Sequence, residues 1–366
     1  MSNLYTMATE DDKFRADEKN IRKLVRRLIE ISDNPKKKTK KDELNIIKSK
    51  LNHLVVVDHC DCKQIILKHE SSLTGHGQSL GISPSATLCQ INGAPDGFYL
   101  FRNALTVETQ YDLCKLALTS FPLSEHTNIT NLRKIQSESS SSTSATAPSS
   151  WKDSLDGLRW VSLGLHYDWT TRQYLPPELS HSSIPADFSC LCQELASMCC
   201  LTLTPEAVIV NYYPLNGQMC GHLDDAEHNM DEPIVSLSLG CDCIFLIGGR
   251  SKADPPIPIL LRGGDAVVMS GQSRYCYHGV PAIIPCHINL SQLIYSVSAP
   301  SSSHSATDNP SLDICTANIY DEDSDDADAP FIREYMRRNR VNMNTRRVKR
   351  ADGRWESKNG SGYTPS

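Results

Sequence analysis

A succession of short, strand-like segments in the second half of the chain constrains the fold more than any other feature. The segments are rich in β-branched and aromatic residues, and turn residues such as Gly263-Gly264-Asp265 separate them. They are Val208–Tyr213, Ile234–Leu239, Cys243–Ile247, Ile259–Leu261 and Ala266–Met269. Short strands in this number are typical of a sandwich or a jelly roll. The mouth of such a fold can bring together side chains that lie far apart in the sequence.

The stretch from Asn211 to Asp224 places a histidine beside a carboxylate. His222 and Asp224 are two residues apart, so on an extended backbone they leave the same face. Two histidine nitrogens and one carboxylate on one face of a metal, with the opposite positions open, form the ligand set of non-haem Fe(II) oxygenases. The third ligand must come from elsewhere. His278 is the candidate, because a jelly-roll mouth can bring it beside His222.

The H-x-D pattern is not specific by itself. It also occurs at His59–Asp61 and His166–Asp168, and a single histidine is usually a core or surface group. The pattern at His222–Asp224 differs in its surroundings, because Asn211 and Tyr213 share one face of the strand that precedes it. We therefore interpret the other two occurrences as accidental.

The composition is that of a globular protein. With 366 residues, the chain can form one large domain or two ordinary ones. It has no apolar run of about eighteen residues and no signal-peptide pattern, so we expect no membrane association. Its 14 cysteines include three C-x-C pairs and no C-x-x-C, which predicts mostly buried thiols in a reducing compartment. A zinc site at His59–Cys62 is the alternative, although the C-x-x-C spacing of zinc modules is missing.

Residues 1–87 are predicted to form a basic, partly helical N-terminal extension. Apolar residues recur there at the spacing of one helix face, at Ile21, Leu24, Val25, Leu28 and Ile29. Two interpretations stay open: a surface helix packed on the domain, or a helix that also contacts nucleic acid or another anionic partner. The run Lys36–Lys41 favours the second and resembles a nuclear localisation signal. We expect a protein of the nucleus and cytoplasm, with the mitochondrion as a further candidate compartment.

Residues 88–348 are predicted to form the main domain. It begins with a predicted strand at Gly97–Phe101 and a predicted helix at Val107–Leu118, and a second helix is expected at Ala186–Cys200. Arg333–Val348 is predicted to be the last ordered element and is strongly basic.

Two polar inserts interrupt this domain, and we expect both to be disordered. The first, at residues 137–150, is almost entirely serine, threonine and alanine. The second, at residues 300–328, is serine-rich and then acidic. Residues 349–366 are expected to form a flexible tail.

Four short motifs occur in a fixed order: N-x-Y at Asn211, H-x-D at His222, a single histidine at His278, and R-x-N-x-x-x-R at Arg340. In this order they resemble the AlkB-like Fe(II)/2-oxoglutarate dioxygenases, and within that family the eukaryotic AlkB homolog 1 subfamily. The resemblance covers about residues 90–348. It implies an α+β fold with a double-stranded β-helix (jelly-roll) core, flanked by N-terminal helices and interrupted by the disordered inserts.

The resemblance also implies how the cosubstrate 2-oxoglutarate is held. Arg340 would pair with its distal carboxylate, and Arg346 would lie near the end bound to iron. Asn211 and Tyr213 would hydrogen-bond to it, and Asn342 shares the strand face of the two arginines. Arginine suits a dicarboxylate because the guanidinium donates two charge-assisted hydrogen bonds. A straight strand separates Arg340 and Arg346 by about 20 Å at Cα, so we expect their side chains to lean inward or the strand to bend.

The substrate site is where the sequence departs from the family pattern. Some relatives carry an acid that helps to read a methylated base at the position of Ala226, and the last motif often has threonine at the position of Asn344. Asp225 falls on the opposite strand face and is expected to be solvated. Trp160 is a candidate substrate contact, because it lies in a stretch dense in aromatic rings that can stack on an unstacked base. Arg274 is a second candidate, and a structural salt bridge is the alternative role for it.

The activity that the resemblance implies is oxidative demethylation of N-methylated bases in tRNA or DNA. Fe(II) would be bound by His222, Asp224 and His278, and O2 and 2-oxoglutarate would be consumed, with release of formaldehyde, succinate and CO2. No catalytic residue is expected beyond the iron centre. Two alternatives stay open. One is the same iron chemistry on a protein side chain, and the other is a non-catalytic scaffold that binds nucleic acid.

Overall fold

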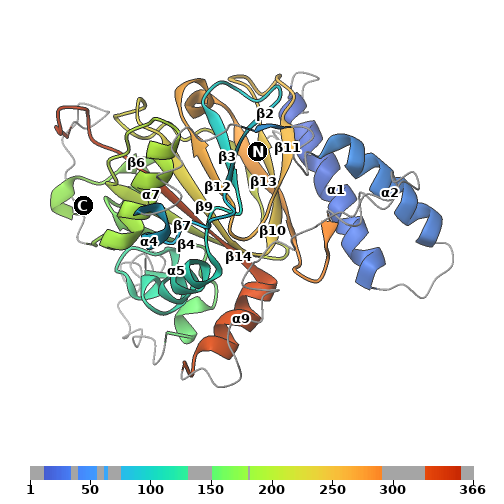
Figure 1. Ribbon diagram of the computed structural model, residues 1–366, viewed down its shortest axis with the longest axis horizontal. Helices are drawn as coiled ribbons and strands as arrows, with labels where there is room; N and C mark the ends of the chain where they lie inside the picture. Colours follow the sequence, from blue (N-terminus) through green and yellow to red (C-terminus); the bar gives the residue numbers. More distant parts are fainter. Residues whose placement is uncertain are drawn as a thin grey trace, which may run out of the picture.

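Two antiparallel β-sheets lie face to face in this computed structural model, with helices on their outer sides (Figure 1). The structure describes residues 12–33, 40–55, 62–64, 76–130, 151–179, 182–290 and 326–355. Apolar side chains from both sheets form the layer between them. The resulting fold is of the α+β class, as predicted.

The larger sheet has eight strands and the smaller has four. In spatial order the larger sheet contains β1 (Cys62–Gln64), β2 (Thr87–Ile91), β3 (Phe98–Arg102), β12 (Ala266–Met269), β9 (Ile234–Gly240), β14 (Asn339–Arg346), β7 (Ala207–Pro214) and β4 (Trp160–Gly164). The smaller sheet contains β11 (Ile257–Leu261), β10 (Asp242–Ile247), β13 (His278–Ile284) and β8 (Met219–His222). A short separate hairpin pairs β5 (Tyr167–Asp168) with β6 (Gln173–Tyr174).

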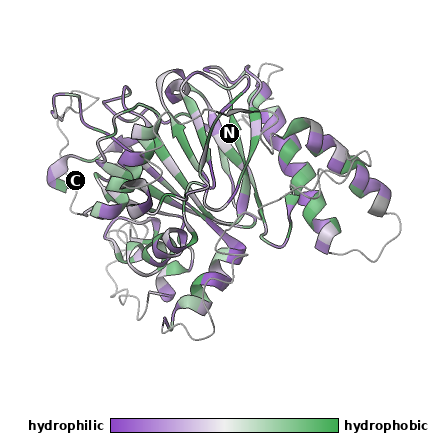
Figure 2. Cartoon of the chain, in the orientation of Figure 1, coloured by the Kyte–Doolittle hydropathy of each residue, from purple (hydrophilic) through white to green (hydrophobic). Residues whose placement is uncertain are grey.

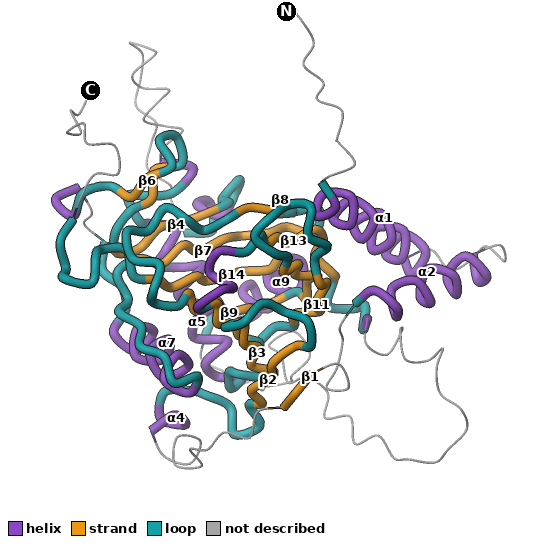
Figure 3. Tube along the Cα trace, turned by 90° about the horizontal axis from the view of Figure 1, so that it is seen from above, coloured by secondary structure: helices purple, strands orange, loops and turns teal. Residues whose placement is uncertain are grey.

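Helices cover the outer face of each sheet. The larger sheet is covered by α5 (Val107–Thr119), α7 (Ala186–Met198) and α9 (Ala329–Arg338), and α4 (His76–Ser79) precedes β2. The smaller sheet is covered by α1 (Lys13–Asp33), and α2 (Lys40–Leu54) packs against α1. In the view from above, α1 and α2 lie on the opposite side of the sheets from α5 and α7 (Figure 3). Helix α1 of the N-terminal segment shares an apolar core with the smaller sheet.

Strand β10 shows why the layers pack in this order. Because successive side chains of a strand alternate between its faces, Cys243, Phe245 and Ile247 pack toward the larger sheet. Ile244 and Leu246 pack toward α1. Both faces of β10 are apolar, so the strand needs a cover on each side. The strands are largely hydrophobic, whereas α1 and α2 carry both kinds of residue (Figure 2).

Strand β14 has one apolar and one polar face, although it lies inside the larger sheet between β9 and β7. Val341 and Met343 belong to the core under the helices. Arg340, Asn342 and Arg346 line a cavity between the two sheets instead, which confirms that they share one strand face. A polar row in the middle of a sheet has to find polar partners, and this row marks the functional site.

The turn between β11 and β12 depends on one buried ion pair. Arg102 donates from Nη1 to Asp265 Oδ2 at 2.7 Å, and Asp265 Oδ1 accepts from the backbone of Asn103. We expect Asp265→Ala to lower the free energy of unfolding by about 3–5 kcal/mol, because it removes the carboxylate that pairs with the buried Arg102 guanidinium. Urea unfolding measures this change, and Asp265→Asn should lose less. A change within about 0.5 kcal/mol, as for a surface substitution, would contradict the assignment.

Most of the predicted elements are confirmed. The strands around residues 98–101, 208–213, 234–239, 243–247 and 266–269 and the helices around 107–118 and 186–200 appear within one or two residues of the expected bounds. No helix in the described ranges is long and apolar enough to cross a membrane.

Three expectations need correction at the C-terminal end. Arg333–Val348 is not one element, because α9 ends at Arg338 and β14 begins at the next residue. The insert predicted to be disordered at 300–328 is described from Asp326 onward, where Asp326 accepts hydrogen bonds from Tyr111 and Lys115 of α5. The tail predicted to be flexible from 349 is described to Trp355, which packs against His228. Residues 137–150, 300–325 and 356–366 lie outside the described residues.

Candidate functional site

A cavity of about 530 Å³ opens between the two sheets. The larger sheet contributes the polar row of β14 together with Asn211 and Tyr213 of β7. The smaller sheet contributes His222 of β8 and His278 of β13. The structure therefore brings together, in one cavity, all of the residues that the four sequence motifs singled out.

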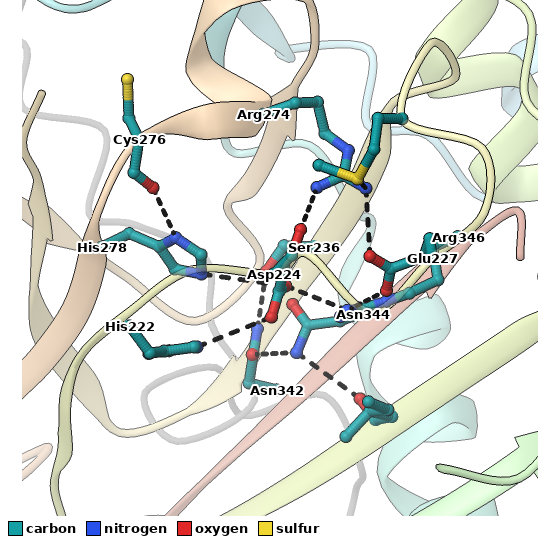
Figure 4. Close-up of polar contacts among 12 residues, drawn as sticks. His222, Asp224, Glu227, Ser236, Arg274, Cys276, His278, Asn342, Asn344 and Arg346 are labelled. Carbon is teal, nitrogen blue, oxygen red and sulfur yellow. Dashed lines mark hydrogen bonds and ion pairs between the residues drawn. The ribbon is translucent and has the colours of Figure 1, made fainter. Parts of the chain in front are cut away.

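Three side chains at this cavity have the geometry of a metal site. The ligand atoms of His222, Asp224 and His278 all lie within 4.8 Å of one another, and no other such group is found in the described part of the chain. The carboxylate of Asp224 faces both rings, with Oδ1 3.7 Å from His222 Nε2 and Oδ2 3.8 Å from His278 Nε2 (Figure 4). The two histidines are paired across β8 and β13 in the ladder.

Backbone carbonyls fix the tautomer of both histidines. His222 Nδ1 lies 2.9 Å from the carbonyl oxygen of Cys220, and His278 Nδ1 lies 3.3 Å from that of Cys276. A carbonyl oxygen only accepts, so each Nδ1 donates and each Nε2 keeps its lone pair. Both free lone pairs face Asp224. This hydrogen bond to the second ring nitrogen is the usual support of a metal-binding histidine.

The charge states also suit a cation. Burial, and after it the nearby His222, lower the pKa of His278 to about 4, so the His278 ring is neutral near pH 7. Burial alone would raise the pKa of Asp224, but neighbouring positive charges, above all Arg346, outweigh burial and hold this pKa below its ordinary range. The site therefore offers a neutral ring nitrogen of His278 and an ionised carboxylate, with His222 Nε2 beside them.

Glu227 supports Asp224 and was not anticipated from the sequence. Its carboxylate is 2% exposed and lies between two guanidinium groups, 2.9 Å from Arg346 Nη1 and 3.3 Å from Arg274 Nη2. Arg346 also reaches Asp224 Oδ2 at 3.0 Å, and Arg274 donates to the backbone oxygen of Asp224 at 2.8 Å. Burial alone would raise the pKa of Glu227, yet the two arginines keep it below the ordinary value. Glu227, Arg346 and Arg274 together hold the loop that carries Asp224 in place (Figure 4).

Arg340 has different surroundings at the inner end of the row. It is 1% exposed, and its Nη2 donates to Ser238 Oγ at 2.7 Å while Nη1 reaches the Cys241 carbonyl at 3.4 Å. Its Nε has no hydrogen-bond partner. Arg340 forms no ion pair with any residue that the structure describes. A buried cation held only by neutral groups is costly, and a carboxylate in the cavity would relieve that cost.

The amides between the two arginines form a chain whose direction is fixed. Asn342 donates from Nδ2 to the Leu237 carbonyl at 2.9 Å and to Ser236 Oγ at 2.8 Å. Its Oδ1 accepts from Asn344 Nδ2 at 2.8 Å. Because the Leu237 carbonyl can only accept, neither amide can be reversed without losing a bond. Asn344, which departs from the family pattern, therefore takes part in the hydrogen bonds of the site.

Aromatic residues form one wall of the cavity mouth. Tyr167 and Trp169 line it, and Trp169 is 39% exposed. Trp160, the residue selected from the sequence, does not line the cavity and packs behind Trp169 with ring centroids 5.6 Å apart. Arg274 also does not line the cavity, because its side chain is committed to Glu227 and the Asp224 backbone.

The remaining histidine, aspartate and cysteine predictions have different outcomes. His166 stacks on His126 at 4.4 Å and pairs with Ser182, and it belongs to no metal-binding group. His59–Asp61, with most of the alternative zinc site, lies outside the described residues. Asp225 is exposed, as expected. Of the cysteines in the described ranges, most are buried free thiols, which confirms that prediction.

Comparison with known proteins places this site in a family. Residues 97–346 match the 2OG-Fe(II) oxygenase superfamily. The chain is 36% identical over 197 residues to the DNA N(6)-methyladenine demethylase ALKBH1A of Arabidopsis thaliana, covering 52% of this chain and 49% of the relative. It is 42% identical over 130 residues to the tRNA demethylase abh1 of Schizosaccharomyces pombe, covering 35% and 43%.

A further relative is the nucleic acid dioxygenase ALKBH1 of Homo sapiens, 35% identical over 132 residues, with 36% of this chain and 33% of the relative covered. The chain spans half or less of the length of these three relatives. Together the matches confirm the AlkB-like resemblance predicted from the motifs. A family match that includes every cavity motif allows one conclusion: the chain belongs to the 2OG-Fe(II) oxygenase superfamily.

Proposed function

We propose that this chain is an Fe(II)- and 2-oxoglutarate-dependent dioxygenase that removes N-methyl groups from nucleic acid bases. One observation carries the proposal: a His-Asp-His group faces the same cavity as a buried guanidinium that has no ion-pair partner among the described residues. The first is a ligand set for iron and the second is a receptor for a carboxylate. The substrate class is proposed from the relatives, which are a DNA demethylase, a tRNA demethylase and a nucleic acid dioxygenase.

His222, Asp224 and His278 are the proposed Fe(II) ligands. Their donor set fits the ion, because two lone pairs and one carboxylate converge and the cavity side stays open. When bound, iron with 2-oxoglutarate and O2 supplies the oxidising power for hydroxylating an N-methyl group, which then leaves as formaldehyde. The protein's own contribution is to hold these three ligands rigidly.

The two arginines of β14 are proposed to have different roles. Arg340 would pair with the distal carboxylate of 2-oxoglutarate, with Asn211, Tyr213 and Asn342 beside it. Arg346 stays on Asp224 and Glu227, and so orients the carboxylate ligand instead of anchoring the cosubstrate directly. Apolar side chains such as Phe245 enclose the inner end and exclude water.

The mouth of the cavity is proposed to receive an unstacked methylated base. The exposed face of Trp169 offers a stacking surface, and Tyr167 lies edge-on to it at 4.9 Å. Arg172 and Lys252 also line the cavity and can meet the phosphates on either side of the base. Trp160 would act indirectly by supporting Trp169, and Arg274 would act by holding the Asp224 loop.

We also infer that the two facing sheets form a double-stranded β-helix, and that this β-helix lies within a dioxygenase domain at about residues 88–348. The N-terminal helices would be its cover, because α1 and the smaller sheet share one apolar core.

A nuclear and cytoplasmic location is inferred from the lysine run at 36–41, and imaging of a fluorescent fusion with that run replaced by alanine tests it.

A substrate panel tests the proposed function. The iron-loaded protein is incubated with 2-oxoglutarate, O2 and either N-methylated tRNA, N-methylated single-stranded DNA or an N-methylated peptide, and formaldehyde is measured. We expect release from one or both nucleic acids. Matched unmethylated substrates are the controls. Release from the peptide alone would replace the proposal by the protein-side-chain alternative, and succinate formation without any substrate-dependent formaldehyde would remove it.

Replacing Glu227 tests the support of the metal site. We expect Glu227→Ala to weaken Co(II) binding about 10- to 100-fold, as for other residues that orient a ligand, because Arg346 and Arg274 lose their shared counter-charge. Titration of the metal-free protein measures the affinity. Glu227→Gln keeps the shape and one acceptor and should lose less. Equal affinity in Glu227→Ala and the wild type would show that Asp224 is oriented without this carboxylate.

A further inference from the structure

Strand β8 carries His222 but is weakly held by its own sheet. It is an edge strand of four residues, and its ladder to β13 has two register pairs, His278 with His222 and Val280 with Met219, with an irregularity between them. Its residues are at least partly exposed. An edge strand this short has few hydrogen bonds to fix it. Something outside the sheet must keep His222 in place.

Phe14, near the start of α1, fills the space beside this strand. A Cβ added to Gly221 would lie 2.4 Å from Phe14 Cε1, and one added to Gly248, just after β10, would lie 2.8 Å from Phe14 Cδ2. The ring is 2% exposed and lies 6.3 Å from the ring of Tyr277. Gly221 and Tyr277 directly precede the two histidines. The ring thus packs behind both ligand-bearing strands at once.

Glu18, one turn further along α1, makes a polar connection to the same strands. It is 2% exposed, and its Oε2 accepts from the backbone N–H of Gly221 at 3.5 Å. Its Oε1 accepts from Arg22 at 2.6 Å, and Arg22 Nε donates to the Pro281 carbonyl of β13 at 3.3 Å. The Glu18–Arg22 pair therefore bridges β8 and β13 from outside the sheet. Glu18 thus contacts β8 directly and is connected to β13 through Arg22.

We infer that Phe14 and Glu18 are positioning residues of the metal centre, acting through β8 and β13 to set the separation of His222 and His278. This inference rests on the proposed Fe(II) site. Neither residue touches the cavity, since neither lines it. Their effect is on where the two Nε2 atoms lie, and small displacements of a ligand weaken a metal site strongly.

The experiment compares two ends of one helix. Phe14→Ala and Glu18→Ala alter the end beside β8. Leu28→Ala alters the other end, where Leu28 is 1% exposed in the same apolar core and lies away from the histidines. Co(II) is titrated into each metal-free protein to obtain Kd, and thermal unfolding gives Tm. We expect Kd to rise about 10- to 100-fold for the first two variants, whereas Leu28→Ala lowers Tm but leaves Kd unchanged.

The possible outcomes test the role of Phe14 and Glu18 separately from the metal site itself. If all three variants weaken Co(II) binding in proportion to their loss of Tm, α1 acts only through general stability and the inference is overturned. If Phe14→Ala does not fold, Phe14→Leu, which keeps an apolar side chain but not the ring, takes its place under the same criterion. If the wild type binds no Co(II), the metal site itself is wrong. If the wild type binds it and the Phe14 and Glu18 variants bind equally well, only the present inference fails.

Discussion

Asp224→Ala is expected to abolish formaldehyde release, with a loss greater than about a hundredfold, because residues that merely orient a metal ligand already cost 10- to 100-fold. Asp224 is the one anionic member of the His-Asp-His group, and its carboxylate faces the Nε2 atoms of both histidines. Without it, only the two histidine nitrogens remain to hold a divalent cation.

The fold should survive this change. Arg346 loses its contact with Asp224 but keeps the 2.9 Å contact between its Nη1 and Glu227 Oε1, so its buried guanidinium still has a counter-charge. The measurement is turnover together with circular dichroism and Co(II) affinity. Asp225→Ala is the matched control, because Asp225 is the adjacent residue, carries the same charge and is exposed. Turnover that persists in Asp224→Ala, or is lost equally in Asp225→Ala, would show that the metal site is misplaced.

Arg340→Met is expected to raise the KM for 2-oxoglutarate by on the order of 10²-fold, because truncating one partner of a buried charged pair costs about 2–5 kcal/mol. Arg340 is the buried cation of the cavity that lacks an ion-pair partner among the described residues. Methionine keeps much of the length of the side chain and removes its charge. The effect should therefore fall on cosubstrate binding and leave the metal affinity near the wild-type value.

The same substitution should not destabilise the protein in the absence of 2-oxoglutarate. The guanidinium is 1% exposed and is held by Ser238 and the Cys241 carbonyl without a counter-charge, and replacing such a group by an apolar one is often neutral or stabilising. Thermal unfolding with and without 2-oxoglutarate measures both effects. The wild type should gain Tm on adding the cosubstrate and Arg340→Met should not. An unchanged KM would remove Arg340 from this role.

The site could be found from the sequence where its residues are close together or follow a strand period. His222 and Asp224 are two residues apart, and Arg340, Asn342 and Arg346 alternate along one strand. These spacings place side chains on a common face whatever the rest of the fold does. Residue spacing alone could not place His278, because its approach to His222 depends on the pairing of β13 with β8. The ordered set of motifs supplied that information.

Other parts could not be found in this way. Glu227 lies beyond the end of β8 in irregular backbone, where no period relates it to Asp224. The helix-to-strand change at Asn339 has no glycine or proline to mark it. Phe14 is an ordinary apolar residue on an amphipathic helix, and its importance comes from two distant glycines, Gly221 and Gly248, that make room for its ring. Such complementarity exists only in the folded chain.

The separation of Arg340 and Arg346 illustrates the same limit. A straight strand places them about 20 Å apart, which was difficult to reconcile with a common ligand. In the structure, Arg340 contacts Ser238 at one end of the polar row and Arg346 contacts Asp224 and Glu227 at the other. No bend is required, because each arginine has its own partners.

The most direct test of the account is the stoichiometry of turnover. Iron-loaded protein is supplied with 2-oxoglutarate, O2 and an N-methylated tRNA or single-stranded DNA, and succinate and formaldehyde are measured in the same samples. The account predicts that both products rise together in equal amounts, that the unmethylated nucleic acid gives no formaldehyde, and that Asp224→Ala gives neither product. Iron-loaded wild-type protein that forms no succinate, or forms formaldehyde only from a methylated peptide, would contradict it.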